Sequence, residues 1–285
     1  MTRGTVRVGI SGWTYPPWRG VFYPKGLPQR RELEYASQRL TSIEVNGSFY
    51  ALQKPESWQS WRAETPDGFL FAVKGGRFIT HMKKLNDVAV PLANFLASGM
   101  LALGDKLGPM LWQLPPNLGF DAGRIADFLD LLPRTTAAAA AMAAGHDERM
   151  EGRAFVTTDA DRPLRHAMEV RHPTFENDGF LGLLRSRDVA VVTADTAGKW
   201  PVFLEPTASL AYVRLHGDQE LYVSGYDDEA LDRWASRVAG WAEAGHDVVV
   251  YFDNDAKVRA PVDAMALMTR LGLAPLVIPG GAAPG

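Results

Sequence analysis

Eight apolar runs of strand length recur along the chain at nearly even intervals. Between them lie segments in which apolar residues recur every three or four positions, which is the period of a helix. The runs are about 34 residues apart, close to the roughly 30 residues that a strand, a crossover helix and the next strand require. We therefore predict an α/β fold with a single (β/α)8 TIM-type barrel, with an open doubly wound sheet as the alternative. The runs occupy residues 6–12, 42–46, 69–74, 109–114, 166–172, 189–195, 210–217 and 247–254.

Two stretches interrupt this rhythm. Residues 133–165 begin with an alanine-rich segment, which favours helix but offers little side chain to bury, so we expect an insertion between strands 4 and 5. Residues 195–209 are too few for a full crossover helix, and two prolines among them favour a loop. We expect one barrel domain over residues 1–278, followed by a flexible tail at 279–285.

Composition excludes several classes of chemistry. The 285 residues contain no cysteine, so disulfides, thiol nucleophiles and thiolate metal sites are ruled out. A net charge of -3 gives no overall attraction to nucleic acids or acidic membranes, so any anion site must be local. The N-terminus lacks the apolar stretch of a signal peptide, and no run approaches the length of a membrane span. We expect a cytoplasmic protein with no membrane partner.

Polar residues fall on one face of several predicted strands. In the fifth run Glu169 and Arg171 alternate with apolar neighbours, and the outward face of a barrel strand packs under helices. The polar face should therefore point into the barrel or toward its mouth at the carboxyl ends of the strands. Buried charges are costly alone, so they should pair with one another or with a ligand. The same alternation selects Glu44, Asn46, Arg214 and His216, while Lys74, Gln113 and Asp195 close three further runs.

These residues also have purely structural explanations. Glu169 and Arg171 would form an ion pair that only supports the barrel, and His216, next to a glycine, would only end its strand. His172 has the opposite parity from Glu169 and would hydrogen-bond a loop. The remaining histidines of the strand and loop regions, His146, His166 and His246, are expected in solvent.

Several sequence segments together resemble the YecE-like family, catalogued as domain of unknown function 72. They are GISGWTY with WRGVFYP (9–24), IEVNGSFY (43–50), FLFAVKGGRFITH (69–81), LGDKLGPMLWQLPP (103–116), AMEVRHPTF (167–175), YVRLHG (212–217) and YFDNDAKVRAPVDAMAL (251–267). The resemblance implies a TIM-type barrel. Its pattern carries onto Glu44, Asn46, Lys74, His81, Gln113, Glu169, Arg171, His172, Asp195, Arg214, His216 and Asn254. The chain departs from it at Asp253, Val258 and Asp263, where relatives often have Asn, Gly and Asn.

We expect an enzyme that uses general acid–base chemistry, either hydrolysis or isomerisation, on a small anionic substrate such as a phosphorylated or carboxylated sugar or nucleotide. Lys74, Arg171 and Arg214 would supply positive charge. Glu44 and Glu169 are candidates for base and acid, with His216 as an alternative proton carrier. The candidate catalytic residues are Glu44, Glu169, Asp195 and His216, and the candidate substrate-binding residues are Asn46, Lys74, His81, Gln113, Arg171, His172, Arg214 and Asn254. Motifs for nucleotide cofactors and zinc proteases are missing from the sequence, so we expect no cofactor and no metal.

Two other functions stay open. The first adds a divalent ion held by Glu169, Asp195 and His216, with Glu44 as a further ligand, although the neighbouring arginines would repel a cation. The second is a non-catalytic module that grips single-stranded nucleic acid through aromatic residues near the strand ends, although the net acidity counts against it. Those aromatic residues are Trp13, Tyr15, Trp18, Tyr50, Trp112, Tyr222, Tyr226 and Tyr251.

Overall fold

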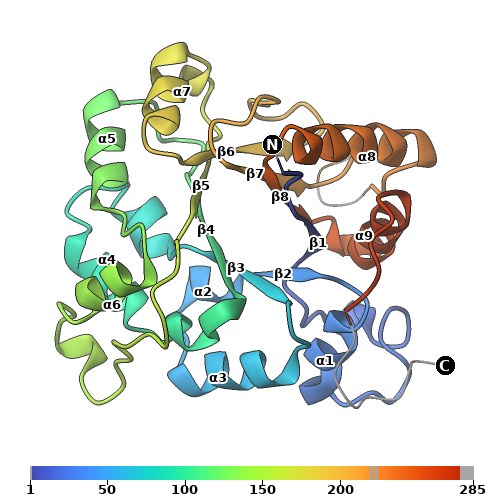
Figure 1. Cartoon of the computed structure of the whole chain (residues 1–285), viewed down its shortest axis with the longest axis horizontal. Helices are drawn as coiled ribbons and strands as arrows, with labels where there is room; N and C mark the ends of the chain where they lie inside the picture. Colours follow the sequence, from blue (N-terminus) through green and yellow to red (C-terminus); the bar gives the residue numbers. More distant parts are fainter. Residues whose placement is uncertain (1, 219–220, 222–223, 277–285) are drawn as a thin grey trace.

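Eight parallel strands close into a barrel, in chain order around the ring (Figure 1). The structure is a computed structural model that describes residues 2–218, 221 and 224–276. Closure is set by the first strand, in which Ile10 is paired with Ile43 on one side and with Phe252 on the other. The predicted (β/α)8 barrel is therefore confirmed, and the open sheet is excluded. The strands are β1 Val6–Ser11, β2 Ser42–Val45, β3 Leu70–Lys74, β4 Leu107–Gln113, β5 His166–Glu169, β6 Ala190–Asp195, β7 Leu210–Leu215 and β8 Asp247–Phe252.

Helices surround the strands (Figure 1). Four of them begin after a residue whose side-chain oxygen accepts a hydrogen bond from a backbone N–H three positions later, namely Asp121, Thr135, Asn177 and Asp227. None of the described helices is long and apolar enough to cross a membrane. The α-helices are α1 Glu32–Ser37, α2 Gly47–Tyr50, α3 Pro55–Glu64, α4 Ala89–Leu96, α5 Ala122–Leu131, α6 Thr136–Ala143, α7 Asp178–Arg185, α8 Asp228–Glu243 and α9 Arg259–Arg270. The shorter helical turns are η1 Pro16–Trp18, η2 Gln29–Arg31, the π-helical η3 Phe78–Met82, η4 Met100–Lys106, η5 Glu148–Met150, η6 Pro173–Phe175 and η7 Asp255–Lys257.

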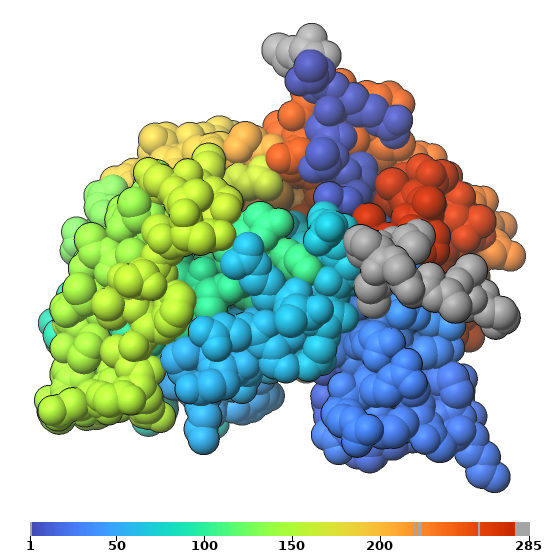
Figure 2. All heavy atoms as spheres, turned by 60° about the horizontal axis from the view of Figure 1, so that its bottom comes forward, coloured from blue at the N-terminus to red at the C-terminus, as the bar shows by residue number. Residues whose placement is uncertain are grey.

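The two irregular connections lie where the sequence predicts them. The connection from β4 to β5 carries α5, α6 and η5, and the alanine-rich α6 packs against α4. Beyond η5 the backbone N–H of Phe155 donates to the carbonyl oxygen of Ala97, and this yellow-green segment forms one flank of the surface in Figure 2. The connection from β6 to β7 contains no helix. The predicted tail at 279–285 and the end of the 1–278 domain lie outside the described residues.

The core has two layers, one on each face of the barrel wall. The interior is filled by small and large side chains in alternation, among them Ala72, Ala167, Leu111, Tyr212 and Tyr251. A larger apolar layer fills the space between the strands and the helices. Because the barrel interior is packed with side chains, polar groups from the strands can gather only at its ends.

One histidine prediction is wrong. His166 is not in solvent but fully buried, with Nε2 2.7 Å from the carbonyl oxygen of Pro133 and Nδ1 accepting from the indole N–H of Trp112 at 3.2 Å. Burial lowers the pKa of His166 to about 4, so the ring is neutral at pH 7. His146 and His246 are partly buried, and each has Nδ1 within hydrogen-bond distance of a backbone carbonyl.

Gly9 offers a test of the close approach between β1 and β2. A Cβ at Gly9 would fall on the backbone carbonyl of its pairing partner Ser42, which cannot move without breaking the ladder. We expect Gly9→Ala to lower the free energy of unfolding by about 2 kcal/mol or more. Gly240→Ala in α8 is the control, because a Cβ there meets nothing within 4 Å. This change should raise the free energy of unfolding by about 1 kcal/mol or less, because alanine has the higher helix propensity. Denaturant titrations compare the two, and an unchanged Gly9→Ala midpoint would contradict the geometry.

Candidate functional site

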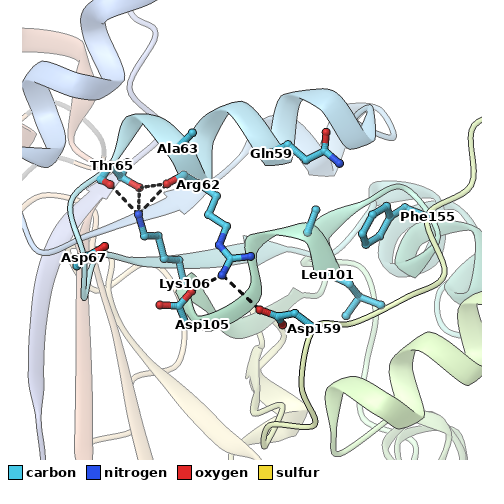
Figure 3. A pocket seen from close by; sticks show the side chains of 11 residues that line it. Gln59, Arg62, Ala63, Thr65, Asp67, Leu101, Asp105, Lys106, Phe155 and Asp159 are labelled. Atoms are coloured by element: carbon cyan, nitrogen blue, oxygen red, sulfur yellow. Dashed lines mark hydrogen bonds and ion pairs between the residues drawn. The ribbon is translucent and has the colours of Figure 1, made fainter.

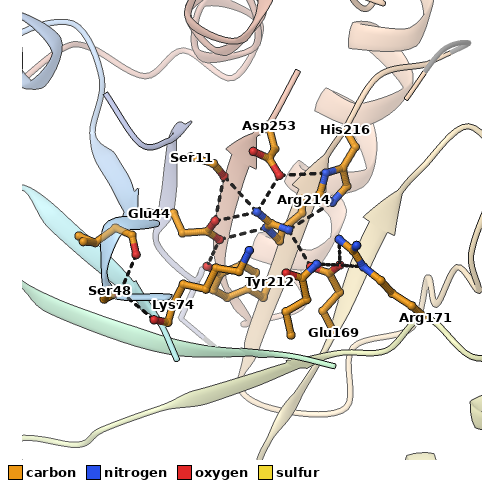
Figure 4. Close-up of polar contacts among 12 residues, drawn as sticks. Ser11, Glu44, Ser48, Lys74, Glu169, Arg171, Tyr212, Arg214, His216 and Asp253 are labelled. Carbon is orange, nitrogen blue, oxygen red and sulfur yellow. Dashed lines mark hydrogen bonds and ion pairs between the residues drawn. The ribbon is translucent and has the colours of Figure 1, made fainter. Parts of the chain in front are cut away.

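Charged side chains from separate strands meet at the carboxyl end of the barrel (Figure 4). The interior parity that gives Tyr212 on β7 and Tyr251 on β8 also gives Arg214 and Asp253 two positions later. Glu44 and Glu169 reach the same place from β2 and β5. The structure thus brings together most of the interior polar set that the sequence predicts. The predicted members that lie on strands are Glu44, Lys74, Gln113, Glu169 and Arg214, and Ser11 of β1 joins them.

Arg214 is the centre of this group. Its guanidinium is fully buried and binds Glu44 through two bonds, from Nε at 3.1 Å and from Nη2 at 2.8 Å. Nη1 donates to Glu169 at 2.8 Å, and Nη2 also donates to Asp253 at 2.8 Å. We call Arg214 with these three carboxylates the arginine hub. Because its donors are occupied by protein, Arg214 organises the site and is not available to hold a substrate anion.

Each carboxylate of the arginine hub has further donors. Glu44 accepts from the hydroxyl groups of Tyr212 at 2.6 Å and Ser11 at 2.9 Å. Glu169 accepts from Gln113 Nε2 at 3.0 Å and from Arg171 Nε at 2.8 Å. Burial alone would raise the pKa of Glu169, but Arg171 and Arg214 hold it well below its usual range. Glu169 is therefore a fixed negative charge at neutral pH rather than a general acid.

Asp253 and Asp255 differ in protonation although they are two residues apart. Burial raises the pKa of Asp253, but Arg214 and His216 outweigh it and bring it to about 2, and His216 Nδ1 lies 3.1 Å from its carboxylate. Burial and the negative charge of Asp253 raise the pKa of Asp255 to about 8. At neutral pH the first is a carboxylate and the second carries a proton. One oxygen of Asp255, Oδ1, is buried without a hydrogen-bond partner among the described residues.

Lys74 ends β3 and projects toward the arginine hub (Figure 4). Its side chain is buried, and its Nζ lies 4.6 Å from the centre of the Phe49 ring. No hydrogen-bond or ion-pair partner of this nitrogen is found in the described part of the chain. Burial, reinforced by the charge of Arg214, lowers the pKa of Lys74 to about 8.

Arg171 and two histidines lie around the mouth. Arg171 follows the end of β5, and its guanidinium stacks 3.9 Å from the centre of the Trp200 ring. His81, on η3, makes an edge contact with Phe49, and burial together with Lys74 and Arg171 lowers its pKa to about 4. His172 caps η6, where its ring accepts from the backbone N–H of Thr174. His172 thus hydrogen-bonds a loop, which is the structural explanation that the sequence offered as the alternative to substrate binding.

Asp195 and Asn254 lie outside the arginine hub, contrary to expectation. On β6 the interior positions belong to Ala190, Val192 and Ala194, so Asp195 takes the opposite face, where it accepts from the hydroxyl of Tyr226 at 3.1 Å. Asn254 likewise falls on the outer parity of β8 and donates to Asp263 at 2.9 Å. Asn46 stays at the mouth, beside a cavity of about 300 Å³ at the carboxyl ends of β1 and β2.

Sequence reasoning passed over Asp253, Asp255, Ser11 and Tyr212. A usable signal existed for Asp253, because it continues the period-two series of Val249 and Tyr251. Ser11 closes β1 in the same way that Lys74 closes β3. Asp255 lies beyond the strand in a short helical turn, where no strand periodicity applies.

The proposed metal ligands are not assembled. Asp195 faces away from Glu169 and His216, on the other side of the barrel wall. Within residues 2–218, 221 and 224–276, no group of three or more His, Asp or Glu side chains is arranged to hold a metal ion.

The aromatic residues behind the nucleic-acid alternative are mostly unavailable for base stacking. Trp18, Trp112, Tyr226 and Tyr251 are buried, Trp13 and Tyr15 are partly buried, Tyr50 is exposed, and Tyr222 lies outside the described residues. A base cannot stack on a ring that is packed in the core.

A larger cavity, of about 700 Å³, lies away from this chemistry (Figure 3). Its lining comes from α3, from the residues that precede β3 and β4 at the amino ends of the strands, and from Phe155 and Asp159 of the β4–β5 connection. Lys106 there donates to the carbonyl oxygens of Arg62 at 2.7 Å and Thr65 at 2.6 Å. Arg62 in turn binds Asp105 and Asp159. The charges of Lys106, Arg62, Asp105 and Asp159 satisfy one another, and none of the described residues that line this cavity has a buried polar side-chain atom without a partner.

Comparisons with known proteins agree with the architecture. A family model described as "Protein of unknown function DUF72" matches residues 7–283. The UPF0759 protein YecE of Escherichia coli K12 is 30% identical over 129 residues, 45% of this chain and 44% of that protein. The UPF0759 protein YunF of Bacillus subtilis is 26% identical over 122 residues, 39% of this chain and 40% of that protein. Each alignment therefore spans less than half of the relative's length.

Two solved structures of DUF72 family proteins share the fold. The protein from Thermotoga maritima is 23% identical, with a TM-score of 0.74 over 94% of this chain and 99% of that chain. The protein from Enterococcus faecalis is 16% identical, with a TM-score of 0.72 over 94% and 96%. At these identities the likeness establishes the TIM-type barrel and nothing about chemistry.

Removal of Arg214 tests the arginine hub. Arg214→Met leaves three carboxylates without their shared cation, and we expect the free energy of unfolding at pH 7 to fall by about 3–5 kcal/mol. Arg214 lowers the pKa of Glu169 in the folded protein. Its contribution to the free energy of unfolding is therefore complete above the ordinary carboxyl pKa and is lost as the pH falls and Glu169 is protonated. The difference in the free energy of unfolding between the wild type and Arg214→Met should therefore become smaller below about pH 4. Arg187→Met, which removes an exposed pair with Asp130, should have a far smaller effect.

A second test uses the proton on Asp255. With a folded pKa of about 8, Asp255 keeps its proton while the unfolded chain loses it near pH 4, so stability falls as the pH rises between these values. Asn resembles the protonated acid and does not titrate. We expect the free energy of unfolding of Asp255→Asn, relative to that of the wild type, to rise by more than about 1 kcal/mol between pH 5 and pH 8. Unfolding curves at both pH values measure this, and a constant difference would count against the raised pKa.

Proposed function

The chain belongs to the family described as protein of unknown function DUF72, and we propose that it is an enzyme that transfers protons within a small anionic substrate at the carboxyl end of its barrel. The reaction would be a hydrolysis or an isomerisation. The substrate class is a small molecule that carries a carboxylate or phosphate group. Barrel enzymes place their chemistry at this end of the strands.

The observation that carries the proposal is the position of Lys74. A charged side chain that is 9% exposed normally has a partner, because burying a lone charge is costly. No hydrogen bond or ion pair of Lys74 Nζ is found among the described residues, although the charges of Glu44, Glu169 and Asp253 act on it, whereas Arg214 is bound directly by these three carboxylates. An anion in the mouth would supply the missing partner. The positive charge for substrate binding is thus assigned to Lys74 and Arg171 rather than to Arg214.

Arg171 complements Lys74 as a positioned cation. Its side chain is only 12% exposed, one edge binds Glu169, and the flat face rests on Trp200. A guanidinium held in this way loses little conformational entropy when it binds an anion. His81 is neutral because of its lowered pKa, so it adds a hydrogen-bonding ring without further charge.

Asp253 and Asp255 support proton transfer. General acid–base catalysis needs one group that holds a proton and one that accepts it at the working pH. The pKa values of about 8 for Asp255 and about 2 for Asp253 provide such a pair. This revises the expected pair of Glu44 and Glu169, because Glu169 is held as a charged carboxylate. Glu44 and His216 remain candidates beside them.

The cavity near Asn46 gives room for the uncharged part of a substrate. It has a volume of about 300 Å³ and is lined in part by Trp13, Tyr15, Asn46 and Gln53. Indole rings and amide side chains suit a flat or hydroxyl-bearing group. Its place beside β1 and β2 puts it next to the strands that carry Ser11 and Glu44.

Titration calorimetry with inorganic phosphate tests the anion site. We expect wild-type protein to bind phosphate and Lys74→Met to bind it about tenfold more weakly or worse, the cost of one charge-assisted hydrogen bond. Lys74→Arg keeps the charge and should stay within a few-fold of the wild type. Circular dichroism confirms that both variants fold. Equal phosphate binding by wild type and a folded Lys74→Met would overturn the proposal, as would no binding by the wild type.

A further inference from the structure

We propose that Lys74 is a covalent catalyst whose side-chain amine captures the carbonyl carbon of a small anionic aldehyde or ketone as a Schiff base. The inference rests on the proposed function, because the same mouth must first hold the anion. It adds the chemical class of the substrate, an anionic carbonyl compound, and a bond between substrate and protein.

The first support is geometric. A lysine nucleophile needs a nitrogen that is held in place by its side chain but is not engaged as a hydrogen-bond donor. Lys74 ends an interior-facing strand, so its reach is fixed by the barrel, and Nζ has no hydrogen-bond acceptor among the described residues. Its position at the carboxyl end of β3 directs it toward the group of charges that Figure 4 shows.

Lys106 is the contrasting lysine of this fold. It is also buried, but its Nζ donates to two carbonyl oxygens and lies 3.3 Å from the hydroxyl oxygen of Thr65. It precedes β4, at the opposite end of the barrel. Such an ammonium group ties two segments together and has no free electron pair to offer. Lys106 is thus a buried lysine with a structural role, whereas Lys74 is the buried lysine to which we assign the reaction.

The second support is the protonation of Lys74. Only the neutral amine attacks a carbonyl, and a buried lysine next to another cation loses its proton more readily. Burial and Arg214 lower its pKa to about 8, which leaves about a tenth of the side chain neutral at pH 7. The titratable and charged groups that face Lys74 are Glu44, His81, Glu169, Arg214 and Asp253.

The step balances within the site. The lone pair of Nζ forms a bond to the carbonyl carbon while the pair of the C=O π bond moves to oxygen. Both protons of the amine then pass to that oxygen, which leaves as water, and a C=N bond remains. A carboxylate has to relay these protons. The carboxyl groups whose charges act on Lys74 are Glu44, Asp253 and Glu169, and we assign the relay to Asp253 and Glu44.

The anionic group of the substrate fits the neighbouring arginine. Arg171 lies close enough to the mouth for its charge to act on His81, as does that of Lys74. In a 2-oxo acid or a phosphorylated ketone the anion lies within a few bonds of the carbonyl carbon. Arg171 would hold this group while Lys74 takes the carbonyl. An uncharged ketone lacks that anchor.

Reductive trapping tests the inference on the full chain. The protein is incubated with sodium cyanoborohydride and either pyruvate, dihydroxyacetone phosphate or uncharged acetone, and adducts are located by peptide mass spectrometry. We expect one adduct, on Lys74, with pyruvate or dihydroxyacetone phosphate, and at least tenfold less with acetone. Labelling should increase from pH 6 to pH 9. Lys74→Arg should give no adduct, and Lys106→Arg, if folded, should be labelled like the wild type.

The outcomes separate this inference from the proposed function. No adduct with either anionic probe, or labelling spread over surface lysines, overturns the Schiff base. If phosphate still binds in that case, the anion site stands and only the covalent step fails. Equal labelling by acetone and pyruvate overturns the requirement for an anion. Absence of both phosphate binding and labelling removes both proposals.

Discussion

The buried guanidinium of Arg214 is the interaction on which the arrangement of the site depends. It joins Glu44 from β2, Glu169 from β5 and Asp253 after β8, so it links strands on different sides of the barrel. A lysine could not replace it, because only a planar guanidinium presents five donors in fixed directions. The three carboxylates would repel one another without it. The carboxyl end of the barrel is thus built around one cation that is fully committed to the protein.

Such a network is a poor device for stability alone. Buried ion pairs recover little more than the cost of removing their charges from water, and well-packed apolar residues often do as well. The same barrel packs Ala, Leu and Tyr side chains in the interior below the arginine hub. The proposed chemistry therefore gives a reason for the cluster of charges above them that stability alone does not give. The local electrostatics support this, because the cluster fixes Glu169 and Asp253 as anions while Asp255 keeps its proton.

Much of this site could be predicted from the sequence, and the failures have physical reasons. Period-two alternation places Glu44, Glu169 and Arg214 correctly, because each lies two positions after an interior residue of its strand. It fails for Asp195 because β6 has its polar residues, Thr193 and Asp195, on the outer face and only apolar residues on the interior face, so polarity indicates the wrong parity. The partners of Arg214 depend on how the strands are staggered around the closed barrel, which no local pattern contains. The fold was predictable because eight repeated units all indicate it.

The two buried lysines contrast a charge that the protein itself satisfies with the charge to which the proposed function is assigned. Lys74 and Lys106 both have little exposed surface, and both have lowered pKa values because burial disfavours the charged form. They differ in what surrounds the nitrogen. Lys106 is enclosed by oxygen atoms of its own chain, whereas Lys74 faces an aromatic ring and the rim of a charged cluster. The residue type does not distinguish them. Their hydrogen bonds do, because Lys106 Nζ donates to oxygen atoms of its own chain and Lys74 Nζ has no acceptor among the described residues, which is the position that the proposed anion would take.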